Sequence, residues 1–97
     1  MSNLKYFING KITKQEVSYI HIENPGFQQG YGTFETIRFN NRRLINIERL
    51  IKRLANGCST VNIPIKYTSQ YLIQSINKTI ESNSLKHGLA KLIITKK

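Results

Sequence analysis

A glycine-rich turn that leads directly into a β-favouring segment is the feature of this sequence that most limits its fold. The turn runs from Gly26 to Thr33, and it contains two more glycines that flank a single tyrosine. Glycine permits a tight turn or a close approach of the backbone to a ligand. The next segment, 34–39, is rich in aromatic and β-branched residues and favours a strand. Because Glu35 and Arg38 are charged residues inside this apolar segment, we expect a site here rather than plain scaffolding.

A helix is predicted after a polar reversal at Asn40–Asn41 and a short strand at 43–45. Apolar residues then recur at helical spacing, which is typical of one buried stripe: Ile47, Leu50, Ile51, Leu54 and Cys58. Asn46 is a suitable N-cap for this helix. Arg53 falls at the border of the stripe, where an arginine can bury its stem while its head reaches a neighbouring cleft.

The remaining segments predict a hairpin, a short strand, a second helix and a final strand. Asn9 and Gly10 tolerate the positive φ of a tight turn between strands at 6–8 and 11–13. The alternation from Val17 to Ile22 predicts another short strand. Thr68 or Ser69 begins a helix that extends to about residue 83, and its apolar face is Leu72, Ile73, Ile76 and Ile80.

The last predicted strand covers 89–95. Strands followed by two helices and a strand predict the α+β class, with a small antiparallel-rich sheet and two helices packed on it. We expect residues 1–97 to form a single small domain of this kind.

Composition excludes several classes of protein. The chain has 97 residues, 39% of them hydrophobic, and no apolar run approaches the roughly 20 residues of a membrane span. Polar residues interrupt the start where a secretory signal would be apolar, so we expect a cytoplasmic protein. The single cysteine, Cys58, excludes an internal disulfide and a thiolate metal cluster. No metal site is predicted, and Cys58 is interpreted as a small buried hydrophobe.

The net charge is +10, which taken alone suggests a polyanionic partner such as nucleic acid. The basic residues, however, are scattered among apolar ones and form no block. Nucleic-acid binding is therefore the least favoured of the functions considered for this chain.

The order and spacing of several motifs are similar to one enzyme family. The motifs are Ile8–Lys11, Gly26–Phe27, Gly30–Arg38 and Ile47–Leu54. Together they resemble the N-terminal domain of the class IV aminotransferases, the fold-type IV pyridoxal-phosphate enzymes. The family includes branched-chain and D-amino-acid aminotransferases and 4-amino-4-deoxychorismate lyases. The resemblance extends over residues 6–96, nearly the whole chain.

The resemblance implies roles for particular residues. Arg53 matches the arginine that grips the phosphate of pyridoxal 5'-phosphate, and a guanidinium can hold a phosphate bidentately. Phe34, with Gln29 and Tyr31 before it, is implied to line the substrate side of the cofactor cleft, with Glu35 close by. Without the resemblance, Phe34 would be interpreted as a core aromatic and Arg53 as a solvated helix residue.

Three positions differ from what many family members have. Tyr31 stands where aspartate is common, Leu50 where histidine is common, and Gln29 where an aromatic residue is frequent. These differences affect substrate recognition more than the cofactor site.

Length is the larger departure from the family. Family members are usually more than twice as long, and none of the lysines here matches the lysine that forms the Schiff base with the cofactor. We therefore expect the chain to be the N-terminal part of a longer two-domain enzyme, inactive alone, whose catalytic lysine lies beyond Lys97. The resemblance implies a homodimer at full length.

The reaction stays open between two outcomes. One is amino transfer to a 2-oxo acid; the other is elimination of pyruvate from aminodeoxychorismate to give 4-aminobenzoate, a step of folate biosynthesis. The run 34–38 looks more like the lyase. A catalytically inactive module that binds an anion or a partner through Arg53, Arg49 and Arg42 is the alternative, and a basic nucleic-acid-binding domain is the third.

Overall fold

The computed structural model describes residues 4–96, which form five strands, three α-helices and one short 3-10 turn. In chain order these are β1 (Lys5–Ile8), β2 (Lys11–Lys14), η1 (Gln15–Val17), α1 (Pro25–Gln29), β3 (Gly32–Asn40), β4 (Arg43–Leu44), α2 (Ile47–Thr60), α3 (Ser69–Ser82) and β5 (Gly88–Thr95). All strand pairs are antiparallel, and they form two sheets rather than the single predicted one. The predicted α+β class is confirmed.

The hairpin of β1 and β2 has the predicted two-residue turn. Asn9 and Gly10 have φ values of 49° and 92°, and Ile8 pairs with Lys11. The hairpin docks on α3, where the Asn83 amide accepts from the Lys5 N–H at 2.7 Å and donates to its carbonyl at 2.9 Å. This small sheet therefore lies beside α3 and does not extend the main sheet.

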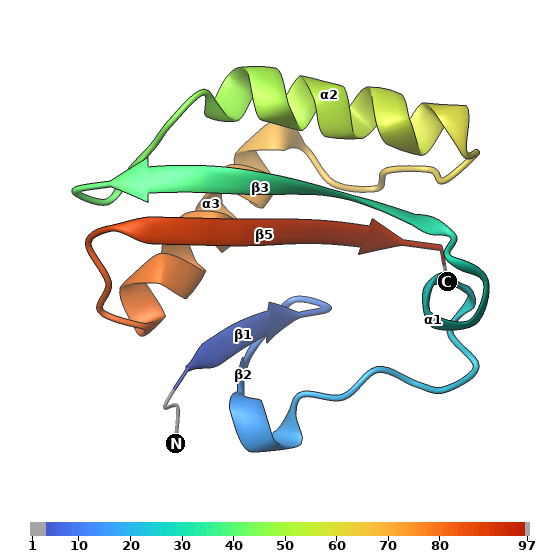
Figure 1. The fold of residues 1–97 in the computed structure, drawn as a ribbon, viewed down its shortest axis with the longest axis horizontal. Coiled ribbons are helices and arrows are strands. Elements are labelled where there is room, and N and C mark those ends of the chain that lie inside the picture. The colour runs from blue at the N-terminus through green and yellow to red at the C-terminus, as the bar shows by residue number, and fades with distance from the viewer. Residues whose placement is uncertain (1–3, 97) are drawn as a thin grey trace.

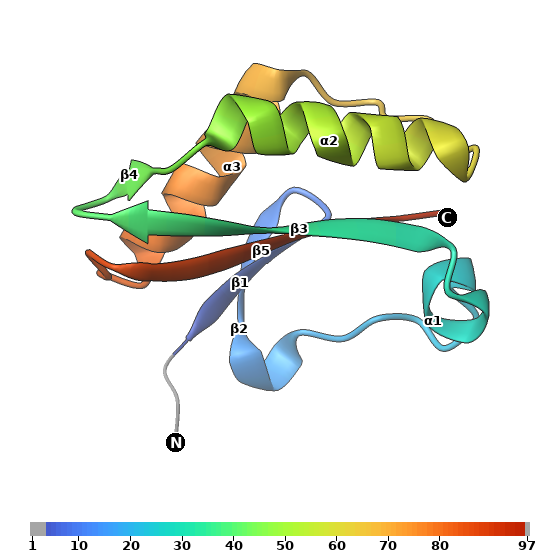
Figure 2. The ribbon, with the colours of Figure 1, turned by 45° about the horizontal axis from the view of Figure 1, so that its top comes forward.

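The main sheet has the strand order β4-β3-β5, with β3 and β5 side by side along nearly their whole lengths (Figure 1). Their register runs from Gly32 opposite Thr95 to Phe39 opposite Gly88. The strand β4 pairs only with residues 39 and 40 of β3. Helices α2 and α3 lie together on one side of this sheet (Figure 2).

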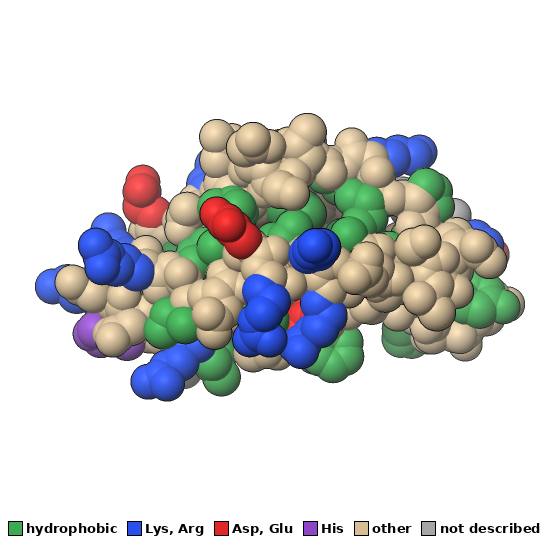
Figure 3. Space-filling view, turned by 90° about the horizontal axis from the view of Figure 1, so that it is seen from above, with side chains coloured by type: hydrophobic (Ala, Val, Ile, Leu, Met, Phe, Trp, Pro, Cys, Tyr) green, Lys and Arg blue, Asp and Glu red, His purple; other side chains and the backbone are tan. Residues whose placement is uncertain are grey.

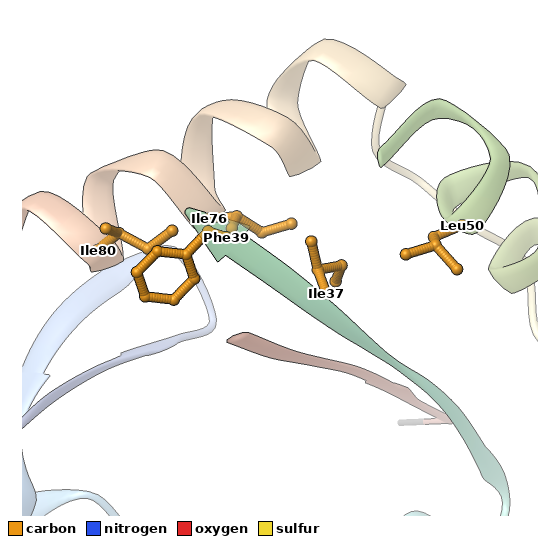
Figure 4. Packing of buried hydrophobic residues seen from close by; sticks show 5 residues of the cluster. All are labelled: Ile37, Phe39, Leu50, Ile76 and Ile80. Atoms are coloured by element: carbon orange, nitrogen blue, oxygen red, sulfur yellow. The ribbon is translucent and has the colours of Figure 1, made fainter. Parts of the chain in front are cut away.

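The buried core fills the space between β3 and these two helices. Ile37 and Phe39 point from β3 toward Leu50 of α2 and toward Ile76 and Ile80 of α3 (Figure 4). Burial of each such side chain contributes about 1.5–3 kcal/mol. The predicted stripe of α2 is confirmed, since Leu50, Ile51, Leu54 and Cys58 are buried and Ile47 is half-buried.

The helix α3, the second of the two predicted helices, also follows its predicted pattern. The Thr68 side chain accepts from the Tyr71 N–H at 3.1 Å, which confirms Thr68 as the cap. Leu72, Ile76 and Ile80 are buried, while Ile73 is half-buried. Within residues 4–96, every helix is too short or too polar to cross a membrane.

The strand predicted from Val17 to Ile22 is wrong. Val17 ends the 3-10 turn, and residues 18–21 have no regular secondary structure and pair with no described strand. The apolar residues of this segment are 58–78% exposed: Val17, Tyr19, Ile20 and Ile22. Neither the odd-numbered nor the even-numbered residues are therefore buried in a core. Alternation predicts a strand only where a partner strand is available to complete the hydrogen bonds.

Two local details also differ from the prediction. The reversal between β3 and β4 uses Asn41 and Arg42, with φ values of 52° and 63°, rather than residues 40 and 41. Asn46 does precede α2, but it adopts a left-handed conformation with φ of 58°, and its side chain makes no capping hydrogen bond. Asparagine tolerates that conformation better than most residues, which explains its place between β4 and α2.

Candidate functional site

An ion pair joins the helix α2 to the strand β3. The Arg53 guanidinium donates from Nε to Oε2 of Glu35 at 2.5 Å and from Nη2 to Oε1 at 2.7 Å. Glu35 is only 8% exposed, whereas the Arg53 side chain is 62% exposed. Two parallel hydrogen bonds of this kind fix the plane of the guanidinium.

The spacing of residues on the two elements explains why they meet. Gly57 of α2 lies against Thr33 of β3, and a Cβ atom at Gly57 would be 2.9 Å from the Thr33 Oγ1. Arg53 precedes Gly57 by four residues, about 6 Å along a helix, and Glu35 follows Thr33 by two residues, about 6.6 Å along a strand. Because these distances match, the close contact at Gly57 aligns Arg53 with Glu35.

Both members of the ion pair, Glu35 and Arg53, are stabilised in their charged forms. The hydrogen bond from Arg53 is the largest cause that lowers the pKa of Glu35; burial opposes it, and the charges of Arg53 and Arg49 lower this pKa further. The same hydrogen bond raises the pKa of Arg53. Near the middle of the face seen in Figure 3, basic side chains lie beside acidic ones.

Arg53 keeps donors available for an anion. A guanidinium carries five N–H groups, and the carboxylate of Glu35 uses two of them. The remaining three belong to a side chain that is largely exposed. Arg53 is thus held in one orientation and can still donate to a second negatively charged group.

The glycine-rich turn is fixed at the end of β5. Asn24 caps α1, and its Oδ1 accepts from the Gly26 N–H at 2.7 Å. A Cβ atom at Gly26 would be 2.5 Å from the Cβ of Thr95, so only glycine fits there. Gly30, whose φ is 70°, caps the C-terminal end of α1, and the Lys96 N–H donates to the Tyr31 carbonyl at 2.9 Å.

The face of the main sheet that is opposite Glu35 carries exposed apolar and basic side chains. Phe34 is 57% exposed, and the Lys91 Nζ lies 4.4 Å from the centroid of its ring. Ile93, opposite Phe34 in the register, is also 57% exposed. Sequence reasoning did not select Lys91; alternation along 89–95 would have placed it beside Phe34 only once the pairing of β3 with β5 was known.

The four residues predicted for the substrate side come from the end of α1, the turn after it and the strand β3. Gln29 ends α1 and Tyr31 follows the turn, while Phe34 lies further along β3. Phe34 and Glu35 are consecutive strand residues, so their side chains lie on opposite faces. The structure brings Glu35 together with Arg53, and the substrate roles of Gln29, Tyr31, Phe34 and Glu35 remain predictions.

Comparison with known proteins identifies the family of this chain. The sequence profile of the family described as "Amino-transferase class IV" matches residues 32–97, which include the strand β3, the helix α2 and both members of the ion pair. The chain belongs to the class IV aminotransferase family.

Individual relatives agree with this membership. The D-alanine aminotransferase of Listeria monocytogenes serotype 1/2a (strain 10403S) is 25% identical over 93 residues, which are 96% of this chain and 32% of the relative. The chain thus spans about a third of the length of the curated relatives that it matches.

Solved structures agree with the fold. The branched-chain aminotransferase of the archaeon Thermoproteus uzoniensis superposes with a TM-score of 0.87 at 18% identity over 97% of this chain and 33% of its own. A putative 4-amino-4-deoxychorismate lyase from Legionella pneumophila gives 0.77 at 26% identity over 84% of this chain and 30% of its own. Another branched-chain aminotransferase of the same fold, with a TM-score of 0.87 at 16% identity, was solved in complex with N-(5'-phosphopyridoxyl)-L-glutamate.

Proposed function

We propose that this chain is the phosphate-holding N-terminal domain of a pyridoxal-phosphate enzyme, either an amino-acid aminotransferase or an aminodeoxychorismate lyase. The observation that carries the proposal is the two-point contact between Arg53 and Glu35, which orients a guanidinium that remains 62% exposed. The chain belongs to the class IV aminotransferase family, and a protein of the same fold was solved with a phosphopyridoxyl compound, which supports a cofactor phosphate as the anion that Arg53 binds.

The donor set of the site fits the phosphate of the cofactor. A phosphate group has several acceptor oxygens, and Arg53 has three N–H groups that Glu35 does not use. When bound, pyridoxal phosphate supplies an aldehyde for linkage to an amine and an electron-withdrawing ring. In this proposal Arg53 binds the phosphate, and Glu35 keeps Arg53 in position.

Phe34, Gln29 and Tyr31 are proposed to lie on the substrate side. Phe34 offers an exposed aromatic surface that can exclude water from a bound substrate. Lys91 lies over the same ring and provides a positive charge for a substrate carboxylate. All substrates of both reactions carry a carboxylate, so this face suits either.

The lysine that binds the cofactor covalently is proposed to lie in a second domain outside these 97 residues. Relatives are about three times as long as this chain, which leaves room for such a domain in the whole protein. The homodimer of the whole enzyme is likewise a proposal.

The phosphate role can be tested with pyridoxine 5'-phosphate, which lacks the aldehyde and so cannot label surface lysines. Binding to the 97-residue chain is followed by phosphorus NMR, with Arg53→Ala, Arg53→Lys and the control Lys52→Ala. We expect Arg53→Ala to weaken binding about tenfold or more, since a hydrogen bond to a charged group contributes about 1.5–3 kcal/mol. Lys52→Ala should remain within about twofold of wild type.

Arg53→Lys separates charge from geometry, because lysine keeps the charge but cannot form the two parallel bonds. It should bind more weakly than wild type and more tightly than Arg53→Ala. Equal losses for Arg53→Ala and Lys52→Ala would refute the phosphate role. Pyridoxine without the phosphate should not distinguish the variants.

The two reactions can be distinguished by the products that the complete protein containing these residues forms. An aminotransferase forms a new amino acid from a 2-oxo acid, whereas the lyase releases 4-aminobenzoate from aminodeoxychorismate. If the cofactor-loaded protein forms neither product, that result favours the inactive anion-binding module instead.

A further inference from the structure

The chain contains the same dipeptide, asparagine followed by glycine, at two places with different surroundings. Asn9–Gly10 forms the turn between β1 and β2, whereas Asn56–Gly57 lies inside α2. Both asparagines are exposed. The two places therefore differ in backbone conformation and hydrogen bonding rather than in access to water.

Deamidation is the reaction to which an asparagine before a glycine is most open, because glycine has no Cβ that shields its nitrogen. The glycine nitrogen attacks the side-chain carbonyl carbon of the asparagine, and the new C–N bond closes a five-membered imide. The Cγ–Nδ2 bond breaks, and the proton lost from the glycine nitrogen leaves with the amide as ammonia. Water then opens the imide at either of its two carbonyls, which yields aspartate or isoaspartate. Water is the only co-reactant.

In the Asn9–Gly10 turn the reacting groups are free. Among the described residues, the Gly10 N–H donates no hydrogen bond and the Asn9 side chain makes none. The hairpin is a two-stranded sheet of its own with no buried residue in either strand, and such a hairpin is marginally stable by itself. The turn can therefore change its backbone angles, and bring the Gly10 nitrogen to the Asn9 side chain, while the core stays folded.

The helix α2 holds Asn56–Gly57 in a conformation that cannot react. Inside an α-helix each N–H donates to the carbonyl four residues earlier, so the Gly57 N–H is bonded to the carbonyl of Arg53. Gly57 also lies against Thr33, since a Cβ atom at Gly57 would be 2.9 Å from the Thr33 Oγ1. The five-membered ring can form here only after this part of α2 opens.

We propose that Asn9 is a site of deamidation in the folded chain, and that α2 protects Asn56 from the same reaction. The aspartate product places a negative charge beside Lys11. The isoaspartate product also lengthens the main chain by one carbon in a turn of two residues. Because the turn sets the pairing of Ile8 with Lys11, this extra carbon shifts the register of the hairpin.

The altered turn lies next to α3. A Cβ atom at Gly10 would be 3.7 Å from the Tyr71 hydroxyl, and the Tyr71 ring is in edge contact with Phe7 of β1 at 6.3 Å between centroids. A shift of register moves Phe7 relative to this ring. We therefore expect isoaspartate at position 9 to loosen the hairpin from α3, with the Tyr71 ring as the reporter.

Trypsin separates the two sites, because cleavage after lysine and arginine gives the peptides Tyr6–Lys11 and Leu54–Lys66. The sequence has no aspartate, so any aspartate or isoaspartate found in these peptides comes from deamidation. The 97-residue chain is incubated in mildly alkaline buffer, and timed samples are digested and fragmented by mass spectrometry to assign each change to one position. An unincubated sample gives the background. A parallel incubation in urea measures both positions without the fold.

In the folded chain we expect position 9 to convert at least about tenfold faster than position 56, because α2 opens more rarely than the hairpin turn. In urea the two positions should convert at similar rates. Both rates should rise with pH, since the glycine nitrogen must lose its proton. Asn9→Gly is the matched control, because it keeps the positive φ of the turn but has no side-chain amide. Its Tyr71 ring signals should stay constant during the incubation, while those of the wild type change in proportion to the isoaspartate formed.

Equal rates at positions 9 and 56 in the folded chain overturn the proposal, as does the absence of conversion at position 9 when urea allows it. Hydrogen exchange of the Gly57 amide in the same sample tests the cause of the protection. Slow conversion at position 56 with an unprotected Gly57 amide would contradict the role given to α2. Unchanged Tyr71 signals in the converted chain would contradict the predicted effect on the hairpin.

Discussion

Arg53 of α2 and Glu35 of β3 are joined by two hydrogen bonds of 2.5 and 2.7 Å, although one side chain is largely exposed and the other is nearly buried. The buried carboxylate thus acts as an anchor for the exposed guanidinium. Removal of Arg53 leaves a buried charge without its partner, whereas removal of the Glu35 charge leaves an exposed cation. The two substitutions are therefore expected to have unequal effects on stability.

Glu35→Gln should change how stability depends on pH. The pKa of Glu35 is lowered in the folded state, chiefly by its hydrogen bond from Arg53. Its contribution is therefore present above the unfolded value of about 4.3 and is lost as pH falls through the lower folded value. Thermal unfolding should show a steeper loss of stability with acid in the wild type than in Glu35→Gln, with the two converging at low pH.

Glu48→Gln is the control for this comparison, because Glu48 is exposed in the first turn of α2. Its profile against pH should follow that of the wild type through the acid range. If Glu35→Gln also followed the wild type, the ion pair would contribute nothing to folding.

Gly57→Ala tests whether the close contact with Thr33 sets the position of α2. Alanine is favoured over glycine inside a helix by about 0.8–1.0 kcal/mol, but its Cβ would be 2.9 Å from the Thr33 Oγ1. We expect Gly57→Ala to stabilise the chain when Thr33→Ala is also present. In the wild-type background, the increase in the free energy of unfolding should be smaller by at least about 0.5 kcal/mol. Urea unfolding of the four proteins measures this coupling. Additive effects would show that the contact is not tight.

The sequence predicted those elements whose pattern is local. The stripe of α2 needs only its own spacing, and the Asn9–Gly10 turn needs only two residues that tolerate positive φ. The predicted strand from Val17 to Ile22 failed because its existence depends on a distant partner.

The same distinction between local patterns and distant contacts applies to the candidate site. The spacing on α2 and the family resemblance together selected Arg53. Its pairing with Glu35 could not be predicted, because it depends on which strand lies beneath α2 and in what direction. Likewise, Lys91 could be placed over Phe34 only from the register between β3 and β5.

Cys58 is expected to be unreactive in the folded chain. It is 1% exposed on the inner face of α2, and burial raises the pKa of its thiol. Because the thiolate is the reactive form, labelling by a thiol reagent should be about a hundredfold or more slower in the native state than in urea. It is the only cysteine of the chain, so the total signal reports on this position alone. Rapid labelling of the native chain would contradict the packing of α2 on the sheet.

Two phenylalanines of β3 test the assignment of its faces. Phe39 is 3% exposed and packs in the core, whereas Phe34 is 57% exposed on the opposite face with Lys91 over its ring. Phe39→Ala should destabilise the chain by about 3–5 kcal/mol, an amount that can exceed the whole stability of a small domain. Phe39→Leu, which keeps most of the volume, should cost less than about 1.5 kcal/mol.

Phe34→Ala should change stability by only about 0.5–1 kcal/mol, since it removes exposed surface and one cation–π contact. Urea unfolding of the three variants provides the measurement. If Phe34→Ala were as damaging as Phe39→Ala, the face bearing Phe34 would be part of the fold rather than a surface for a ligand. A small effect leaves that face available for the substrate role proposed above, because a folding role would then not account for an exposed aromatic side chain at this position.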